Sequence, residues 1–467
     1  MYKEKLDAYL DAHVDEMIED IFRLVRINSE RTEPLEGMPY GRGPKEALDE
    51  ALKMAEEKGF ATKNYDNYVG TVDFGDLESQ LDILAHLDVV PAGDGWTVTE
   101  AYNPVRVDDK IYGRGVADDK GPAIAALYAM MAVKACQVPL KKNVRLIVGT
   151  DEECGSSDIV HYYAVEKEAP MTFSPDAEFP VINLEKGGLS PVFEAAWEES
   201  KELPRILSIK GGTKVNVVPG KAYAVVEGVS EDVLKETAAA VTADTKVEFT
   251  WDTEGEKKSI MAVGVGAHAA SPFDGNNALT ALLLLLSKLP LAPCKGVEAV
   301  KSLVELFPHG DCYGKALGVA MEDEISGVLT LNFSMMDYCL TGFKGQFDSR
   351  TPVCANEENM RDVAEAAFAR HGIQMEHKNM KKPHHVPADS PFVQTLLKAY
   401  EEYTGLEGEC LAIGGGTYVH NLERGVAFGC SLPGTDNRMH GADEVALVNE
   451  LLLSAKIFAK VIVDLCM

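Results

Sequence analysis

Hydrophobic positions change their spacing along the first third of the chain. Residues 4–27 place apolar side chains every three to four positions, which predicts an amphipathic opening helix. Residues 81–90 and 144–148 are short apolar runs, the pattern that buried strands of a parallel sheet show. The second of these strands would run directly into the acidic stretch Asp151–Glu153.

Ligands of open α/β sheets bind just outside the carboxyl ends of the strands, and this is where Glu152 and Glu153 are expected. Two adjacent carboxylates at such a place repel each other unless a cation separates them or one is protonated. A metal ion held by one glutamate, with the other free to act as a base, would resolve the conflict. The alternative is a solvated pair of loop acids, which is common in so acidic a chain.

Further candidates follow at intervals typical of successive βα units. His86, Asp118, Glu153 and Asp176 are separated by 32, 35 and 23 residues. Because the ends of parallel strands meet at one edge of a sheet, these residues are expected to converge there. One acidic strand end would carry little weight, whereas several at one edge favour a binding site.

Two of these positions have a local context that fits a metal site. Side chains alternate along a strand, so His86 and Asp88 face the same side, where Asp88 would orient either a metal-bound or a structural histidine. Asp118 lies in a glycine-rich loop before a predicted helix over 122–136. It would serve there as a metal ligand or as a simple partner of the helix dipole.

The pattern of predicted strands and helices changes near residue 186 and changes back near residue 383. Between them, β-hairpin and helix patterns alternate, which predicts an inserted α+β domain over 186–382. The flanking stretches, 1–185 and 383–467, are expected to form one α/β domain with a mostly parallel sheet flanked by helices. Its last part holds a glycine turn, Gly414–Thr417, able to form an anion nest, and a predicted final helix over 443–465.

Composition excludes several classes of function. The chain has 467 residues, 46% of them hydrophobic, and a net charge of −29, which argues against nucleic acid or an anionic membrane as a partner. Nine cysteines without a C-x-x-C pair favour reduced thiols, so metal ligands would come from histidine, aspartate and glutamate. No signal peptide is recognisable at the start of the chain, and a cytoplasmic protein is expected.

The motifs resemble, in order, those of the M20 metallopeptidases. The matching segments are His86-Leu-Asp88, Gly113-Arg-Gly-Val-Ala-Asp-Asp-Lys-Gly121, Asp151-Glu-Glu153, Ser174-Pro-Asp176, Gly264-Val-Gly-Ala-His-Ala-Ala270 and the late His440. Within that family, the long insert and Gly212-Thr-Lys-Val-Asn-Val-Val-Pro219 are most similar to the PepV-type bacterial dipeptidases. The insert resembles a doubled lid, for which two ferredoxin-like subdomains are one arrangement, and the doubling implies a monomer.

The resemblance implies a site with two divalent metal ions. Asp118 would bridge both ions, His86 and Asp176 would complete one, and Glu153 and His440 the other. Zinc is the expected ion, with manganese or cobalt as alternatives, because all three accept mixed imidazole and carboxylate ligands.

The same resemblance assigns roles around the metals. Glu152 would be the general base and Asp88 the partner of the metal-bound histidine. His268 and Asn216 would reach the scissile carbonyl from the lid, and His268 is a candidate to stabilise the oxyanion. The substrate carboxylate would be bound by the following residues: Arg350, Gly415 and Thr417.

The function implied is hydrolysis of the peptide bond of dipeptides by a metal-activated water, with a small peptide as the only partner. An N-acyl amino-acid deacylase would use the same site on a different amide. A metal-binding relative that has lost catalysis is the third possibility, against which the presence of Glu152 beside five candidate ligands argues.

Overall fold

A computed structural model describes residues 2–467, which form two compact units. The first unit comprises the described residues up to Glu185 together with His384–Leu411 and Gly416–Met467. The second comprises Lys186–Pro383 and Ala412–Gly415. Each unit has its own hydrophobic core, so each is described by itself.

The first unit is built on a mixed sheet of nine strands, although the last two residues of one of them, β24, are assigned to the second unit. They are β1 (Ala61–Tyr65), β2 (Val69–Asp73), β3 (Ser79–His86), β6 (Asn143–Gly149), β7 (Met171–Ser174), β9 (Val181–Glu185), β23 (His384–His385), β24 (Cys410–Ile413) and β25 (Gly425–Ala427). The order is β1-β2-β6-β3-β7-β25-β9-β23, with β24 paired to β9. The central strands β6, β3, β7 and β25 are mutually parallel. The pairs β1–β2, β2–β6, β25–β9 and β9–β23 are antiparallel.

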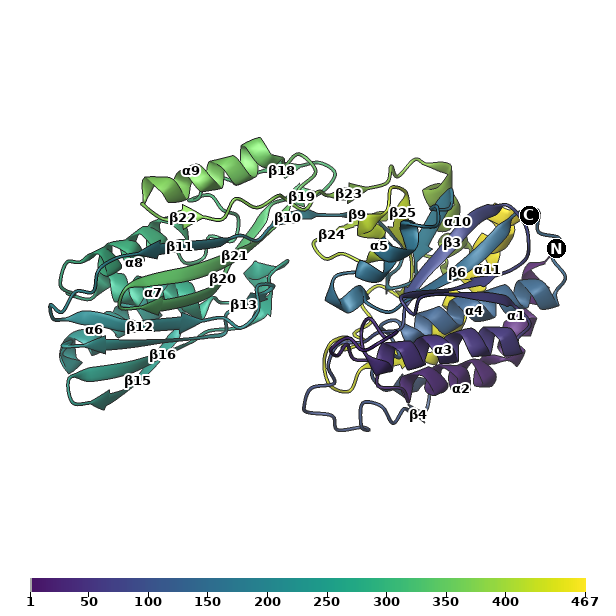
Figure 1. Ribbon diagram of the computed structural model, residues 1–467, viewed down its shortest axis with the longest axis horizontal. Helices are drawn as coiled ribbons and strands as arrows, with labels where there is room; N and C mark the ends of the chain where they lie inside the picture. The colour runs from purple at the N-terminus through teal and green to yellow at the C-terminus, as the bar shows by residue number, and fades with distance from the viewer. Residues whose placement is uncertain (1) are drawn as a thin grey trace. The chain divides into compact units, whose positions relative to one another are not determined.

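Helices surround this sheet (Figure 1). They are α1 (Lys3–Ala12), α2 (Val14–Val25), α3 (Arg42–Glu57), α4 (Lys120–Ala135), α5 (Ser157–Tyr163), α10 (Pro391–Thr404) and α11 (Val448–Cys466). Helices α4 and α11 pack on each other and on β3 and β6, and α3 packs on β1 and β2. Nearly every side chain of α4 is buried, as expected for a helix in the centre of a core. The expected α/β fold class is confirmed.

Short elements complete the first unit. They are β4 (Val105–Val107), β5 (Lys110–Tyr112) and β27 (Val445–Leu447) in one small sheet, β8 (Ala177–Glu178) paired with β26 (Cys430–Ser431), and the 3₁₀ turns η1 (Glu152–Cys154) and η4 (Tyr418–Asn421). The small sheet joins a segment near residue 110 to one near residue 445, and both lead into loops of the candidate site.

The second unit contains a nine-stranded antiparallel sheet. Its strands are β10 (Gly187–Leu189), β11 (Val192–Ala196), β12 (Arg205–Gly211), β14 (Lys221–Glu227), β15 (Glu248–Glu254), β16 (Lys257–Val263), β20 (Thr330–Cys339), β21 (Gly342–Thr351) and β22 (Gln374–Met375). The order is β15-β16-β14-β12-β20-β21-β11-β22, with β10 paired to β21. The strands of this unit therefore form one continuous sheet.

Helices and two small ribbons accompany that sheet (Figure 1). They are α6 (Glu231–Thr245), α7 (Ala278–Lys288), α8 (Lys295–Leu306), α9 (Asp362–Arg370), the turns η2 (Pro272–Asp274) and η3 (Glu357–Arg361), and the ribbons of β13 (Val217–Val218) with β17 (Ala267–His268) and of β18 (Glu322–Asp323) with β19 (Gly327–Val328). Helix α7 carries the leucine run and packs against β12, β14, β16 and β20. Its side chains form the centre of the core of this unit.

The structure corrects two helix predictions. The opening helix over 4–27 is broken at His13, because its imidazole Nδ1 lies 2.7 Å from the carbonyl oxygen of Tyr9, the acceptor that a continuing helix would use. The final helix begins at Val448, because residues 445–447 pair as a strand instead. Among residues 2–467, no helix has the length and apolar character needed to cross a bilayer.

Candidate metal centre

Three parallel strands of the first unit end at one edge of the sheet with a candidate residue at or just beyond each end. His86 is the last residue of β3 and is paired in register with Gly149, the last residue of β6. Glu152 and Glu153 follow β6 in the turn η1, and Asp176 follows β7. Convergence at this edge is what the spacing along the sequence predicts.

The first group of candidate ligands is His86, Asp118 and Asp176. The Nε2 atom of His86 lies 3.0 Å from Oδ1 of Asp118 and 3.5 Å from Oδ2 of Asp176. Asp118 comes from the loop before α4, so the group joins two strand ends to a helix start. All three side chains lie within the reach of one ion.

The second group is Asp118, Glu153 and His440. The Nε2 atom of His440 lies 3.0 Å from Oδ2 of Asp118 and 3.3 Å from Oε1 of Glu153. Asp118 thus turns one carboxylate oxygen to each histidine. In both groups the potential ligand atoms lie within 4.8 Å of one another.

The donor atoms of these groups fit cations. Nε2 of His86 and Oε1 of Glu153 are both buried and lack a hydrogen-bond partner among the described residues. Nδ1 of His86 lies 3.0 Å from the main-chain carbonyl oxygen of Asp88, to which it donates its proton, so Nε2 is the ring atom that can bind a cation once it is deprotonated. Buried polar atoms without partners are unfavourable, and an ion bound between them would satisfy both.

The electrostatics of the site also favour cations. Burial raises the pKa values of Glu152, Glu153 and Asp176 above the ordinary carboxyl range. Burial lowers the pKa of His86, but its contacts with carboxylates outweigh this, and the net pKa is raised well above the usual value. Contacts with Asp118 and Glu153 raise the pKa of His440 to about 10. Divalent cations bound here would favour the ionised carboxylates and the neutral imidazoles, and would thus oppose these shifts.

Asp88 supports the site with its side chain in a way that the sequence did not suggest. Its Oδ1 accepts a hydrogen bond from the main-chain amide of Glu152, and its Oδ2 one from that of Glu153, both at 3.1 Å. The distance from the same carboxylate to Nδ1 of His86 is longer, 3.5 Å. The carboxylate of Asp88 therefore fixes the turn that carries both glutamates, whereas its main chain orients His86.

Two further buried acids act on the same loops. Asp158 accepts hydrogen bonds from the main-chain amides of Thr150 at 2.6 Å and Asp151 at 2.9 Å, and from the hydroxyl group of Tyr418. Asp119 accepts the amide of His86 at 3.0 Å. No sequence signal marks Asp158, because its partners are main-chain amides and a tyrosine that lies far along the chain.

Several of the predicted residues outside the metal groups belong to the second unit. His268 is the last residue of β17, which pairs with β13, and the amide of Ala269 donates to the carbonyl oxygen of Asn216 at 2.9 Å. Arg350 donates from Nε to Asp348 at 2.9 Å and from Nη1 to the carbonyl oxygen of Gly414 at 2.7 Å. Gly415, next to Gly414, belongs to this unit as well.

Thr417 belongs to the first unit, and its two donors are already used. Its amide and its hydroxyl both donate to Oε1 of the buried Glu185, each at 2.9 Å. The other oxygen of Glu185 lies 3.0 Å from Nδ1 of His420. Thr417 thus binds the carboxylate of Glu185, a residue of the chain itself, where a substrate carboxylate is predicted.

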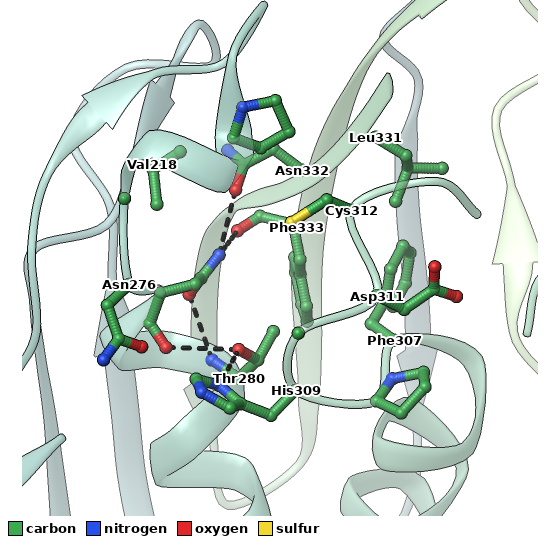
Figure 2. A pocket seen from close by; sticks show the side chains of 15 residues that line it. Val218, Asn276, Thr280, Phe307, His309, Asp311, Cys312, Leu331, Asn332 and Phe333 are labelled. Carbon is green, nitrogen blue, oxygen red and sulfur yellow. Dashed lines mark hydrogen bonds between the residues drawn. The ribbon is translucent and has the colours of Figure 1, made fainter. Parts of the chain in front are cut away.

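A small cavity of the second unit is lined by none of these residues (Figure 2). Its volume is about 60 Å³, room for a water molecule or two. Asn277 caps α7 beside the cavity and donates a hydrogen bond to the carbonyl oxygen of Phe333. Oγ1 of Thr280 lies 2.9 Å from Nδ1 of His309. Pockets that bind small molecules are several times larger, so this one cannot hold a peptide.

Comparisons of the sequence with known proteins all point to one family. The sequence model described as "Peptidase family M20/M25/M40" matches residues 83–464. The protein YtjP of Bacillus subtilis (strain 168) is 37% identical over 459 residues, with 97% of each chain covered. The Beta-Ala-Xaa dipeptidase of Lactobacillus delbrueckii subsp. lactis is 35% identical over 470 residues, which cover 99% of this chain and 98% of that protein.

A solved structure shows that the fold is shared as well. Human carnosine dipeptidase 1 has a TM-score of 0.60 at 16% identity, covering 99% of this chain and 98% of that chain. The family match extends over the segments that carry the two ligand groups. The chain therefore belongs to peptidase family M20/M25/M40 and is a hydrolase of peptide bonds.

Proposed function

We propose that the chain is a two-metal dipeptidase with Glu152 as its general base. The observation that carries the proposal is the placement of Asp118, whose two carboxylate oxygens each lie 3.0 Å from a different histidine, His86 or His440. A carboxylate between two ligand groups is suited to bridge paired ions. The related Beta-Ala-Xaa dipeptidase supports dipeptides as the substrate class.

The two ligand groups would divide the ions between them. His86, Asp118 and Asp176 would hold one ion, and Asp118, Glu153 and His440 the other. Imidazole and carboxylate ligands suit zinc, and they also accept manganese or cobalt. When bound, such ions polarise a carbonyl group and lower the pKa of water to about 7.

Glu152 has the environment that a general base at this site needs. Burial raises its pKa well above the ordinary carboxyl value, and the charge of Asp176 adds to the rise, whereas His86 opposes it. Bound cations would lower this pKa again and favour the ionised carboxylate. The carboxylate would then take a proton from the attacking water and pass it to the leaving amine. Asp88 keeps it in place through the amide of Glu152.

Residues of the second unit would bind the substrate. We assign to Arg350 the free carboxylate of a dipeptide, because its guanidinium is held by Asp348 and Gly414 in a fixed direction. His268 would donate to the developing oxyanion, with Asn216 beside it. Gly415 and Thr417 would shape the same subsite, and the hydrogen bonds of Thr417 to Glu185 favour a supporting role for this residue.

The test is hydrolysis by the metal-stripped chain during parallel titrations with zinc and manganese. The substrates are Xaa-Gly and Xaa-His dipeptides, β-alanyl dipeptides, a tripeptide and an N-acetylated amino acid. We expect activity to return near two metal equivalents and to be confined to free dipeptides. Activity on the acetylated compound alone would replace the proposal with a deacylase. Binding of both ions without any turnover would replace it with a non-catalytic metal protein.

A further inference from the structure

Glu444, four residues after His440, connects the two loops that carry Asp118 and His440. Its side chain is completely buried. Oε1 accepts hydrogen bonds from the main-chain amides of Gly115 and Ala117, both at 3.0 Å, and from that of Asp118 at 3.3 Å. One carboxylate oxygen thus gathers three amides of the loop that ends at the shared ligand. No local sequence pattern marks this contact, because these amides lie more than 320 residues away.

The other oxygen of Glu444 is held by an equally buried arginine. Arg114 donates from Nη1 to Oε2 of Glu444 at 2.7 Å and from Nη2 to the carbonyl oxygen of Gly441 at 3.0 Å. Gly441 directly follows His440. The guanidinium therefore contacts the histidine loop and the acid that holds the aspartate loop at the same time.

His440 lies in a loop and not at the end of a strand. Its side chain is 59% exposed, and its φ of +63° is in the left-handed region that residues other than glycine rarely adopt. The first ligand group differs, since His86 ends a central strand and Asp176 follows one. The geometry of the second group thus depends on how the loop of Asp118 is fixed to that of His440.

We propose that Glu444 is a positioning residue that sets the distance between Asp118 and His440 and thereby the affinity of the second ligand group for its ion. The inference rests on the proposed two-metal site and goes beyond it by assigning a role to an acid that touches neither ion. Residues that orient metal ligands change metal affinity by about 10–100-fold when replaced. The competing explanation is a buried ion pair with Arg114 that contributes to folding stability alone.

The experiment compares the full-length chain with three variants, each stripped of metal and titrated with zinc in a chelator-buffered calorimeter. Glu444→Gln removes the charge and one acceptor oxygen. Glu444→Asp keeps the charge facing Arg114 but withdraws the carboxylate from the three amides. Asp20→Asn is the matched control, because Asp20 is a buried acid of the same unit, paired with Lys58 at 2.6 Å and remote in the sequence from both loops.

We expect both Glu444 variants to bind the second zinc equivalent about 10–100-fold more weakly, with a smaller change for the first. Asp20→Asn should lower the melting temperature and leave both affinities unchanged. Wild-type affinities in the Glu444 variants would overturn the inference, and so would equal losses in the control. If the wild-type chain binds fewer than two zinc ions, the proposed function falls together with the inference.

A measurement on the unchanged chain covers the case in which the variants do not fold. Amide hydrogen exchange of the metal-free protein should show protection at Gly115 and Ala117, although both lie in a loop, because their amides are bonded to Glu444. Exchange of these amides at the rate of an open loop would show that Glu444 does not hold them, and would overturn the proposal.

Discussion

Nδ1 of His86 lies 3.0 Å from the main-chain carbonyl oxygen of Asp88. A carbonyl oxygen can only accept, so this contact fixes the proton on Nδ1 and leaves Nε2 as the atom that faces the carboxylates. The side chain of Asp88 holds the amides of Glu152 and Glu153 instead. The two functions of Asp88 are therefore separable by mutation.

Replacement of Asp88 by asparagine should impair catalysis more than metal binding. The main-chain carbonyl that orients His86 is kept, whereas an amide group cannot accept hydrogen bonds at both of its ends. We expect kcat to fall about 10–100-fold, with the affinity for the first metal equivalent within a few-fold of wild type. Steady-state kinetics and zinc titration measure the two effects. If the affinity for the first metal equivalent falls as much as kcat does, the carboxylate of Asp88, and not its carbonyl group, orients His86.

Glu152 and Glu153 are adjacent and chemically identical, so each serves as the control for the other. Glu152→Gln should lower kcat about 10²–10⁴-fold, the contribution typical of a general base, while two zinc ions still bind. Glu153→Gln should weaken the binding of the second zinc ion, because Oε1 of Glu153 faces His440. Activity and metal content of both variants separate the roles. Full turnover in Glu152→Gln would rule out the proposed base.

Replacement of Arg350 should weaken the binding only of substrates that carry a free carboxylate. Arg350→Ala is expected to raise KM for a free dipeptide about 10–100-fold and to have little effect on the corresponding dipeptide amide, which lacks the charge that the guanidinium would bind. Arg205→Ala is the control, because Arg205 lies in the same unit and forms ion pairs with Glu227 and Glu199. Equal changes for dipeptide and amide would remove Arg350 from the substrate site.

Asp323 should make the second unit sensitive to acid. Burial by itself would raise its pKa, but hydrogen bonds from Ser326 and Cys354 outweigh burial and lower it to about 2. A carboxyl whose folded pKa lies below its unfolded value of about 3.9 stabilises the fold above that value, and this contribution is lost as the pH falls toward 2.

The change that tests this is Asp323→Asn, with the neighbouring exposed Glu324→Gln as control. At pH 7 we expect the first variant to lower the free energy of unfolding by about 1 kcal/mol and the second to leave it unchanged. Urea unfolding of the metal-free chain at pH 7, 4.5 and 3 measures the difference, which should shrink toward the lowest pH. A difference that stays constant with pH would show that the charge of Asp323 is not responsible.

Local patterns in the sequence predicted much of the fold. Period-two and period-3.6 hydrophobicity located most helices and strands, since each reports which face of one element is buried. The pattern did not predict the break at His13, where a side chain takes the carbonyl oxygen of Tyr9. Nor did it show that the strands of the insert form one continuous sheet. Assignment to the PepV-type subgroup stays a prediction.

By itself, the sequence determined the family and the order in which acids and histidines follow the central strands, because both are written in residue type and spacing. Only the tertiary structure decided which oxygen of Asp118 faces which histidine, and that Asp158 and Glu444 hold the loops around them. Asp158 and Glu444 do so by accepting hydrogen bonds from main-chain amides, and the amides that Glu444 holds lie in a distant part of the chain. Packing of the whole unit brings such groups within hydrogen-bond distance, and no local pattern records it.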